Sequence, residues 1–339
     1  MGTDSATRGK GARLAFGRAA PSRVPDRLLK WVLTGLAGLI LAIIAFFFVR
    51  LYVEAQPAFD KFGHLGFVFD NEWNVSAGRF GAWPLIVGTL ITSAVALLIG
   101  IPIAVATAVF LTELCPRRMR ETLSTLVELL AAVPSVVYGL WGIFFLIPKL
   151  RPAEQWFSDT FEFLPFVGGK VAGPNYFIGG LILAIMIIPI VSSISREVMA
   201  TVPSENKEAA LALGATRWEM IRMAVLPYSR AGVAGAAMLG LGRAIGETIA
   251  VTLVIGNSPN IGNALFDQGY TLAAVVANEF GEAASDPVHR AALIAAGLVL
   301  FVLTLLVNLI ARSYVVRAER SQRIGRRERP LEQALDRAK

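Results

Sequence analysis

Residues 80–112 read FGAWPLIVGTLITSAVALLIGIPIAVATAVFLT, an uninterrupted run of 33 uncharged residues between Arg79 and Glu113. An α-helix rises about 1.5 Å per residue, so about 20 apolar residues are enough to cross the hydrocarbon core of a bilayer. The run lacks the alternation of apolar and polar residues that marks a strand of a membrane barrel. It therefore predicts a membrane-spanning helix, in which the backbone polar groups are hydrogen-bonded within the segment.

The rest of the chain has the same character. Of its 339 residues, 55% are hydrophobic and 17% are charged, whereas a soluble domain carries about 25% charged residues. Further uncharged runs occupy residues 31–49, 129–148, 171–195 and 291–311. Another apolar region, 229–255, is interrupted by Arg243 and Glu247. We therefore predict an all-α polytopic membrane protein with six transmembrane helices, and we exclude a disordered chain, a secreted mini-protein and a soluble enzyme.

Lysine and arginine are distributed unequally between the predicted loops. Residues 1–30, 113–121, 196–228 and 312–339 contain 23 of them, and residues 51–79, 149–170 and 256–289 contain five. Short loops rich in these residues stay in the cytoplasm. We therefore predict a multi-pass protein of the cell (plasma or inner) membrane with both termini in the cytoplasm. The basic termini are interpreted as topology determinants beside anionic membrane lipid, so no nucleic acid is expected as a partner.

The spans and loops divide the chain into successive regions. We predict a basic cytoplasmic tail at 1–30, a first transmembrane helix at 31–50, an outer loop at 51–79, a core of five transmembrane helices at 80–312 and a charged cytoplasmic tail at 313–339. The first outer loop contains a group of aromatic residues, namely Phe59, Phe62, Phe67, Phe69 and Trp73. They are interpreted as loop packing or as an interfacial belt, with a docking surface for an external partner as the alternative.

The sequence offers few residues for metal or nucleotide chemistry. One cysteine, Cys115, and two histidines, His64 and His289, do not make a cysteine or histidine metal site. A Walker A loop needs Gly-(x)4-Gly-Lys-Ser/Thr to surround phosphates with backbone N–H groups, and the stretch at 9–11 lacks this spacing. We therefore expect no cofactor in this chain and no enzymatic activity of its own. Any ATP-driven process needs a separate ATPase.

The segment 204–227 joins two predicted spans on the cytoplasmic side. Pro203 followed by Ser204 is typical of a helix start. Gly214 interrupts the helical pattern, which predicts a bend or a turn. A short helix–turn–helix in this position is either a surface loop packed on its own bundle or an element inserted into the groove of a partner. The composition does not decide between the two.

Two charged residues lie within the fifth predicted span. Arg243 is 15 residues past Tyr228, about 22 Å along a helix, and a charge at that depth costs at least about 2.5–3.5 kcal/mol. Glu247 follows one turn later on the same face. The pair is either a self-neutralised ion pair joining helices or a substrate site, in which the forked guanidinium binds an oxyanion. In a substrate site, Glu247 could accept a hydrogen bond from a protonated oxyanion and so distinguish phosphate from sulfate.

Several motifs resemble those of one transporter family. Glu-Ala-Ala-(x)3-Gly at 208–214, followed by a distal Leu-Pro, resembles the cytoplasmic loop of ABC importer permeases, although Ala224 stands where the family usually has isoleucine. Gly-Arg-Ala-Ile-Gly-Glu-Thr at 242–248 and Pro-Ser-Val-Val-Tyr-Gly-Leu-Trp-Gly at 134–142 are similar to motifs of phosphate-importer permeases. The likeness extends over about residues 80–312. It implies that these residues are the permease core of a type I (MetI-like) ABC importer bundle.

The resemblance implies a permease subunit of an ATP-driven phosphate importer, with Arg243 and Glu247 in the substrate pathway. It implies that 204–227 is the coupling loop, which contacts the ATPase through Glu208, Ala209, Ala210 and Gly214. The implied partners are a homologous permease of the PstA type, a dimer of ATP-binding-cassette ATPases of the PstB type, which uses the ATP, an external phosphate-binding protein of the PstS type and membrane lipid. The alternatives are a permease for another oxyanion such as sulfate or molybdate, an ATP-independent transporter or channel, and a polytopic membrane enzyme.

Overall fold

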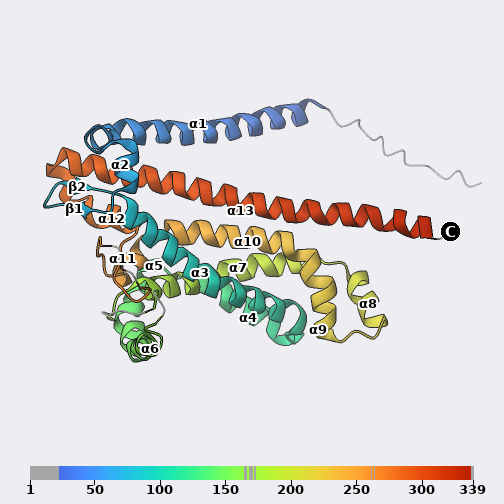
Figure 1. Ribbon diagram of the computed structural model, residues 1–339. Coiled ribbons are helices and arrows are strands. Elements are labelled where there is room, and N and C mark those ends of the chain that lie inside the picture. The colour runs from blue at the N-terminus through green and yellow to red at the C-terminus, as the bar shows by residue number, and fades with distance from the viewer. Residues whose placement is uncertain are drawn as a thin grey trace, which may run out of the picture. The chain divides into compact units, whose positions relative to one another are not determined.

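The computed structural model describes residues 23–336, apart from 164–165, 168–170, 172, 261 and 263. Most of the predicted tail at 1–30 therefore lies outside the described residues. The chain forms two units, 1–50 and 51–339. The described part of the first unit is the beginning of the helix α1 (Arg23–Phe62), and Figure 1 labels this and the other elements.

The described part of the second unit is almost entirely helical. Its α-helices are α2 (His64–Phe69), α3 (Trp83–Val109), α4 (Arg117–Ala131), α5 (Ser135–Trp141), α6 (Ile147–Thr160), α7 (Tyr176–Ala200), α8 (Ser204–Ala212), α9 (Arg217–Met220), α10 (Leu226–Gly246), α11 (Ile249–Val254), α12 (Leu272–Glu279) and α13 (Pro287–Asp336). Wider π-helical turns are η1 (Phe110–Leu114), η2 (Gly142–Leu146) and η3 (Ile221–Val225), and η4 (Glu282–Ser285) is a 3-10 turn. The strands β1 (Trp73–Asn74) and β2 (Arg79–Phe80) pair antiparallel, with Trp73 opposite Phe80.

Five helical stretches in the described chain are long and apolar enough to cross a membrane, which confirms the predicted class of all-α polytopic membrane protein. They are Leu28–Phe62, Trp83–Leu114, Ser135–Thr160, Tyr176–Ala200 and Pro287–Ser313. The sixth predicted span, 229–255, is helical in two pieces. Because Glu247 and Thr248 separate α10 from α11, this region is not one continuous apolar helix.

Pro134 divides the third predicted span, 129–148. α4 ends before it and α5 starts directly after it, because a proline has no N–H for the carbonyl four residues earlier. That carbonyl belongs to Leu130, and it accepts a hydrogen bond of 2.9 Å from the hydroxyl of Tyr138 instead. The apolar stretch consequently begins after the proline and continues as α6 into the predicted outer loop 149–170.

Small residues allow α3, α7 and α10 to pack closely in the second unit. A Cβ atom at Gly180 of α7 would lie 2.5 Å from Val95 of α3, and one at Gly240 of α10 would lie 2.7 Å from Val191 of α7. Within a bilayer the hydrophobic effect does not drive helices together, and close backbone approach contributes packing energy in its place. Gly240 therefore allows α10, which carries Arg243, to pack closely on α7.

Aromatic residues of the first outer loop pack around the two-stranded sheet. Phe59, Phe67 and Trp73 are buried in a common hydrophobic cluster, which confirms loop packing for them, whereas Phe69 is exposed. Figure 1 shows β1, β2 and α12 at one end of the second unit and α8 and α9 at the other. We call these the β end and the α8 end.

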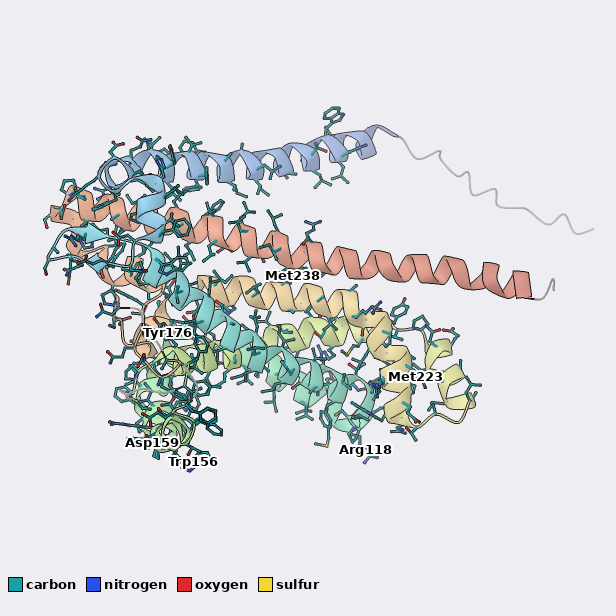
Figure 2. All side chains as sticks on the ribbon, viewed as in Figure 1. Arg118, Trp156, Asp159, Tyr176, Met223 and Met238 are labelled. Atoms are coloured by element: carbon teal, nitrogen blue, oxygen red, sulfur yellow. The ribbon has the colours of Figure 1, made fainter. Side chains whose placement is uncertain are left out.

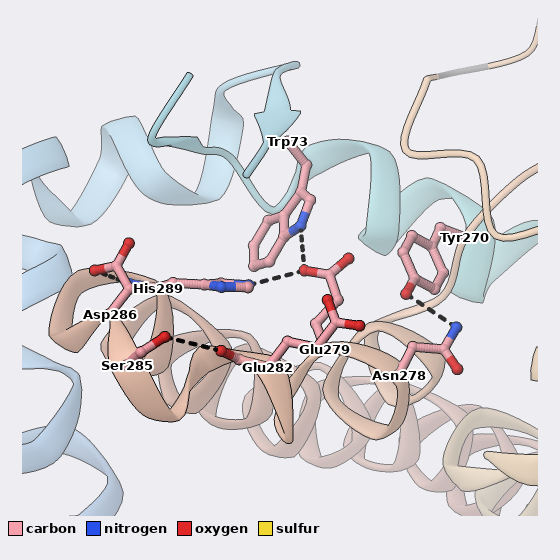
Figure 3. A network of polar contacts seen from close by, with 8 residues as sticks. All are labelled: Trp73, Tyr270, Asn278, Glu279, Glu282, Ser285, Asp286 and His289. Atoms are coloured by element: carbon pink, nitrogen blue, oxygen red, sulfur yellow. Dashed lines mark hydrogen bonds and ion pairs between the residues drawn. The ribbon is translucent and has the colours of Figure 1, made fainter. Parts of the chain in front are cut away.

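Glu279 joins three elements at the β end (Figure 3). Its Oε2 accepts the indole N–H of Trp73 at 3.0 Å and lies 2.9 Å from Nε2 of His289. Beside it, Asn278 donates a hydrogen bond to the hydroxyl of Tyr270, and burial raises the pKa of that tyrosine. Glu279 therefore ties α12 to the sheet and to the start of α13.

Candidate functional site

The 204–227 segment begins where the sequence predicts. α8 starts at Ser204, directly after Pro203, and none of its side chains is buried. Of the residues predicted to couple to an ATPase, the structure leaves Glu208, Ala209 and Gly214 exposed and Ala210 partly buried. All four lie at the α8 end, in α8 and in the turn that follows it.

The turn after α8 depends on the backbone of Gly214, whose φ is +84°. Its N–H donates to the carbonyl of Leu211 at 3.0 Å, and the N–H of Ala215 donates to the carbonyl of Ala210 at 3.2 Å. This pair of hydrogen bonds is the Schellman arrangement, which satisfies the last carbonyls of a helix. No atom lies within 4 Å of the position that a Cβ would occupy. The predicted turn is thus confirmed, and the need for glycine is conformational.

The second helix of the segment starts with a capping box. The Thr216 hydroxyl accepts the N–H of Glu219 at 3.3 Å, and the Glu219 carboxylate accepts the N–H of Thr216 at 2.8 Å. The hydrogen bonds from the backbone and then from the hydroxyl of Thr216 lower the pKa of Glu219. α9 continues through η3 into α10, with Pro227 in the first turn of α10. Residues 217–246 therefore form one helical run.

One face of the segment is attached to the rest of the chain. Nζ of Lys207 lies 2.7 Å from Oε1 of Glu113 in η1, a carboxylate side chain that is only 8% exposed. Ile221 and Val225 are fully buried and belong to the same hydrophobic cluster as Met199 of α7. The attachment therefore combines an ion pair on α8 with apolar packing of η3.

The segment also carries exposed apolar side chains. Leu213 is 90% exposed and Trp218 is 61% exposed, and Leu211 and Met223 are exposed as well. Figure 2 labels Met223 at this end of the molecule. These side chains are exposed in the described part of the chain and are available for contact with another molecule.

Arg243 and Glu247 lie on either side of the end of α10. Nη2 of Arg243 is 3.8 Å from Oε2 of Glu247, which is an ionic contact too long for a direct hydrogen bond. The Glu247 side chain is 8% exposed and that of Arg243 is 39% exposed. Oε1 of Glu247 accepts the N–H of Ala250 at 3.4 Å, so the carboxylate is fixed at the start of α11. The guanidinium makes no hydrogen bond to another residue in the described chain.

The surroundings of Arg243 combine an open backbone with a polar neighbour. A Cβ at Gly242 or Gly246 would meet no atom within 4 Å. The structure therefore brings Arg243 and Glu247 together beside an uncovered stretch of helix. It places this group 17 residues along α10 from its first residue, about 26 Å away at 1.5 Å per residue.

The described residues contain no group of three or more His, Cys, Asp or Glu side chains that could hold a metal ion. The charged groups that gather around α10 are an arginine and a carboxylate, which suit an anion with hydrogen-bonding oxygens.

A protein family with the description "Binding-protein-dependent transport system inner membrane component" matches residues 100–320. The chain belongs to this family. Within it, the "Phosphate transport system permease protein PstC" of Mesorhizobium japonicum is 44% identical over 288 residues, which cover 84% of this chain and 88% of that protein. "PstC 2" of Mycobacterium tuberculosis is 43% identical over 301 residues, covering 86% and 92%. The resemblance to phosphate-importer permeases is thus confirmed.

Two solved structures share the fold. A bacterial ABC transporter involved in the import of alginate has a chain with a TM-score of 0.56 and 19% identity, covering 86% of this chain and 98% of that one. An inward-facing MetNI methionine ABC transporter gives a TM-score of 0.50 and 16% identity, covering 70% and 94%. The architecture is therefore that of ABC importer permeases of the MetI-like type.

Proposed function

We propose that this chain is the permease subunit of an ATP-driven phosphate importer. The observation that carries the proposal is the guanidinium of Arg243, which is partly exposed and makes no hydrogen bond within the described chain. A guanidinium with its forked donors free is suited to two oxygens of an oxyanion. The PstC relatives, 44% and 43% identical, carry the name of phosphate transport permeases, which supports phosphate as the oxyanion.

Glu247 supports phosphate over a fully ionised oxyanion. Near neutral pH phosphate carries a proton, which it can donate to a carboxylate, whereas sulfate has none and is repelled by that charge. When the site is empty, the same carboxylate balances Arg243 at 3.8 Å and so reduces the cost of a charge within the membrane. The Arg243–Glu247 pair therefore balances its own charges in the empty site and binds protonated phosphate in the occupied site.

We infer that the 204–227 segment is the coupling loop, through Glu208, Ala209, Ala210 and Gly214. The exposed Leu213 and Trp218 support a partner on this face. Because residues 217–246 form one helical run, a displacement of α9 moves the end of α10 that carries Arg243. ATP hydrolysis belongs to a pair of PstB-like ATPases, whose closure displaces the segment and opens the site to the opposite side in an alternating-access cycle.

The uncovered helix beside Arg243 supports a path shared with a second permease. We assign this face to a homologous PstA-like subunit, which completes the translocation path. An external PstS-like protein delivers phosphate at the β end, and the α8 end faces the cytoplasm together with both termini. In this arrangement the chain spans the cell membrane several times and carries no ATP site or cofactor of its own.

Uptake of radiolabelled phosphate tests the proposal. Proteoliposomes contain the chain, its partner permease, the ATPase and the binding protein, and uptake is measured with and without ATP. We expect Arg243→Gln to abolish ATP-dependent uptake and Arg230→Gln, an exposed arginine on the same helix, to retain it. Excess sulfate should not compete. Full uptake by an assembled Arg243→Gln complex would refute the role of the guanidinium, and competition by sulfate would refute phosphate specificity.

A further inference from the structure

A second polar site lies at the α8 end, apart from the Arg243–Glu247 pair. It is a pocket of about 380 Å³ that α4 and α7 form together. Its lining includes Arg117, Arg120, Glu121, Ser124, Glu128 and Arg196. Five of these side chains come from α4 and one comes from α7, so the pocket is built into the contact between the two helices.

The lining is positively charged. Arg196 forms an ion pair with Glu128, in which Nη2 and Oε1 are 2.5 Å apart. Arg117, Arg120 and Glu121 form no ion pair within the described part of the chain. Two unpaired arginines against one unpaired glutamate leave one positive charge in excess. The pocket therefore attracts an anion.

Two buried donors in this pocket lack acceptors. The Nε of Arg120 and the Oγ of Ser124 are both buried and have no hydrogen-bond partner among the described residues. Ser124 is only 6% exposed, and it follows Arg120 by four residues, which places both side chains on one face of α4. Buried polar groups in folded proteins are almost always hydrogen-bonded. The Nε–H of Arg120 can only donate, so its missing partner is an acceptor, and the hydroxyl of Ser124 can donate to the same partner.

A negatively charged partner with several acceptor oxygens would satisfy both buried groups and balance the excess positive charge. A phosphate group meets this requirement, because its oxygens can take hydrogen bonds from a guanidinium fork and from a hydroxyl at the same time. Arg117 stands in the first turn of α4, where the helix dipole also favours negative charge. We propose that this pocket binds a phosphate group, supplied by an anionic lipid headgroup at the membrane surface or by free inorganic phosphate.

A binding experiment on the full chain separates the two sources. All proteins carry Arg243→Gln, so that the proposed transport site does not contribute. The first arm measures binding of radiolabelled inorganic phosphate to the chain in nanodiscs of phosphatidylcholine. The second measures retention of phosphatidylglycerol by native mass spectrometry, after extraction from mixed nanodiscs. The double variant Arg117→Gln/Arg120→Gln is compared with Arg118→Gln, an exposed neighbour on α4 that does not line the pocket.

We expect the double variant to weaken binding at least about tenfold in one arm, as the loss of charge-assisted hydrogen bonds predicts, with Arg118→Gln unchanged. The arm that responds identifies the source of the phosphate group. Ser124→Ala removes only a hydroxyl and should weaken binding of the same ligand. It should leave the unliganded chain at least as stable to heat. Equal binding by the double variant and by Arg118→Gln in both arms would overturn the proposal, as would unchanged binding by Ser124→Ala.

Discussion

Replacing Gly214 by alanine isolates the conformational requirement of the turn after α8. No atom lies within 4 Å of the position that the new methyl group would take, so the change creates no clash. The φ of +84° lies in the left-handed region, which costs an alanine about 1–2 kcal/mol. α8 has no buried side chain to offset this cost. We therefore expect the two hydrogen bonds of the turn to open about 5–30 times more often.

Hydrogen–deuterium exchange measures this opening directly. The amides of residues 213–215 should exchange about 5–30 times faster in Gly214→Ala, the factor that 1–2 kcal/mol implies, while the amides of α7 and α10 keep their wild-type rates. Gly214→Asn is the matched control, because asparagine adopts the left-handed conformation more readily, and its effect should be smaller.

For transport, Gly214→Asp adds a charge to the exposed turn. It should still insert into the membrane but fail to support uptake.

Three results would refute this reasoning. Unchanged exchange in Gly214→Ala would mean that the backbone conformation is not what holds the turn. Faster exchange throughout α7 and α10 would mean that the turn belongs to the cooperative core of the bundle. Normal uptake by Gly214→Asp would contradict the assignment of this turn to the surface that docks on an ATPase.

Three further predictions concern other contacts. Lys207→Met leaves the carboxylate of Glu113, 8% exposed, without its partner, so the attachment of α8 should weaken by about 1–3 kcal/mol and its amides should exchange faster. The pKa of Glu219 is lowered by hydrogen bonds from Thr216. The stabilisation of the cap by Glu219 is therefore complete above the pKa of an unfolded glutamate, about 4.3. It is lost as the pH falls through the lower pKa of the folded state. The exchange rate of the Thr216 amide measures this loss. Glu247→Gln should alter the phosphate/sulfate discrimination of uptake or its pH dependence.

Each of these predictions has its own control. Adding Glu113→Gln to Lys207→Met should restore part of the lost stability, because it removes the uncompensated charge. Glu219→Gln should give a Thr216 exchange rate without the acid transition; a transition that persists would assign it to another group. A Glu247→Gln protein with unchanged selectivity and an unchanged pH profile would favour the ion pair as a purely structural feature.

The sequence predicts the membrane spans well because a bilayer of fixed thickness requires long apolar runs. The uncharged run 80–112 corresponds to α3 and η1, and 291–311 lies within α13. Gly214 was equally predictable, since a glycine between two helical patterns is typical of a left-handed turn. In both cases the deciding information is local.

Contacts between distant residues were beyond this kind of prediction. Glu113 and Lys207 are 94 positions apart, and nothing in either local sequence indicates the pairing. A kink at Pro134 is expected from the proline alone, whereas the capture of the Leu130 carbonyl by Tyr138 depends on the geometry of the break.

The end of α10 at Gly246 was also missed. Apolar composition suggested that the span continued to 255, but the glycine favours helix poorly and Glu247 accepts the N–H of Ala250 at the start of α11. The structure thus places Arg243 close to a helix terminus, whereas apolar composition alone predicts that it lies within a longer span.

The wide turn η3 has a geometrical consequence for Arg243. An α-helix advances about 100° around its axis with each residue, and a π turn closes its hydrogen bond one residue later than an α turn does. If η3 changed to α geometry while Ile221 stayed in place, the residues after η3 would rotate about the helix axis. The rotation would be about 100°, the angle that one residue covers in an α-helix. The direction in which the Arg243 side chain points from the helix axis therefore depends on the geometry of residues 221–225, which end 18 positions before Arg243.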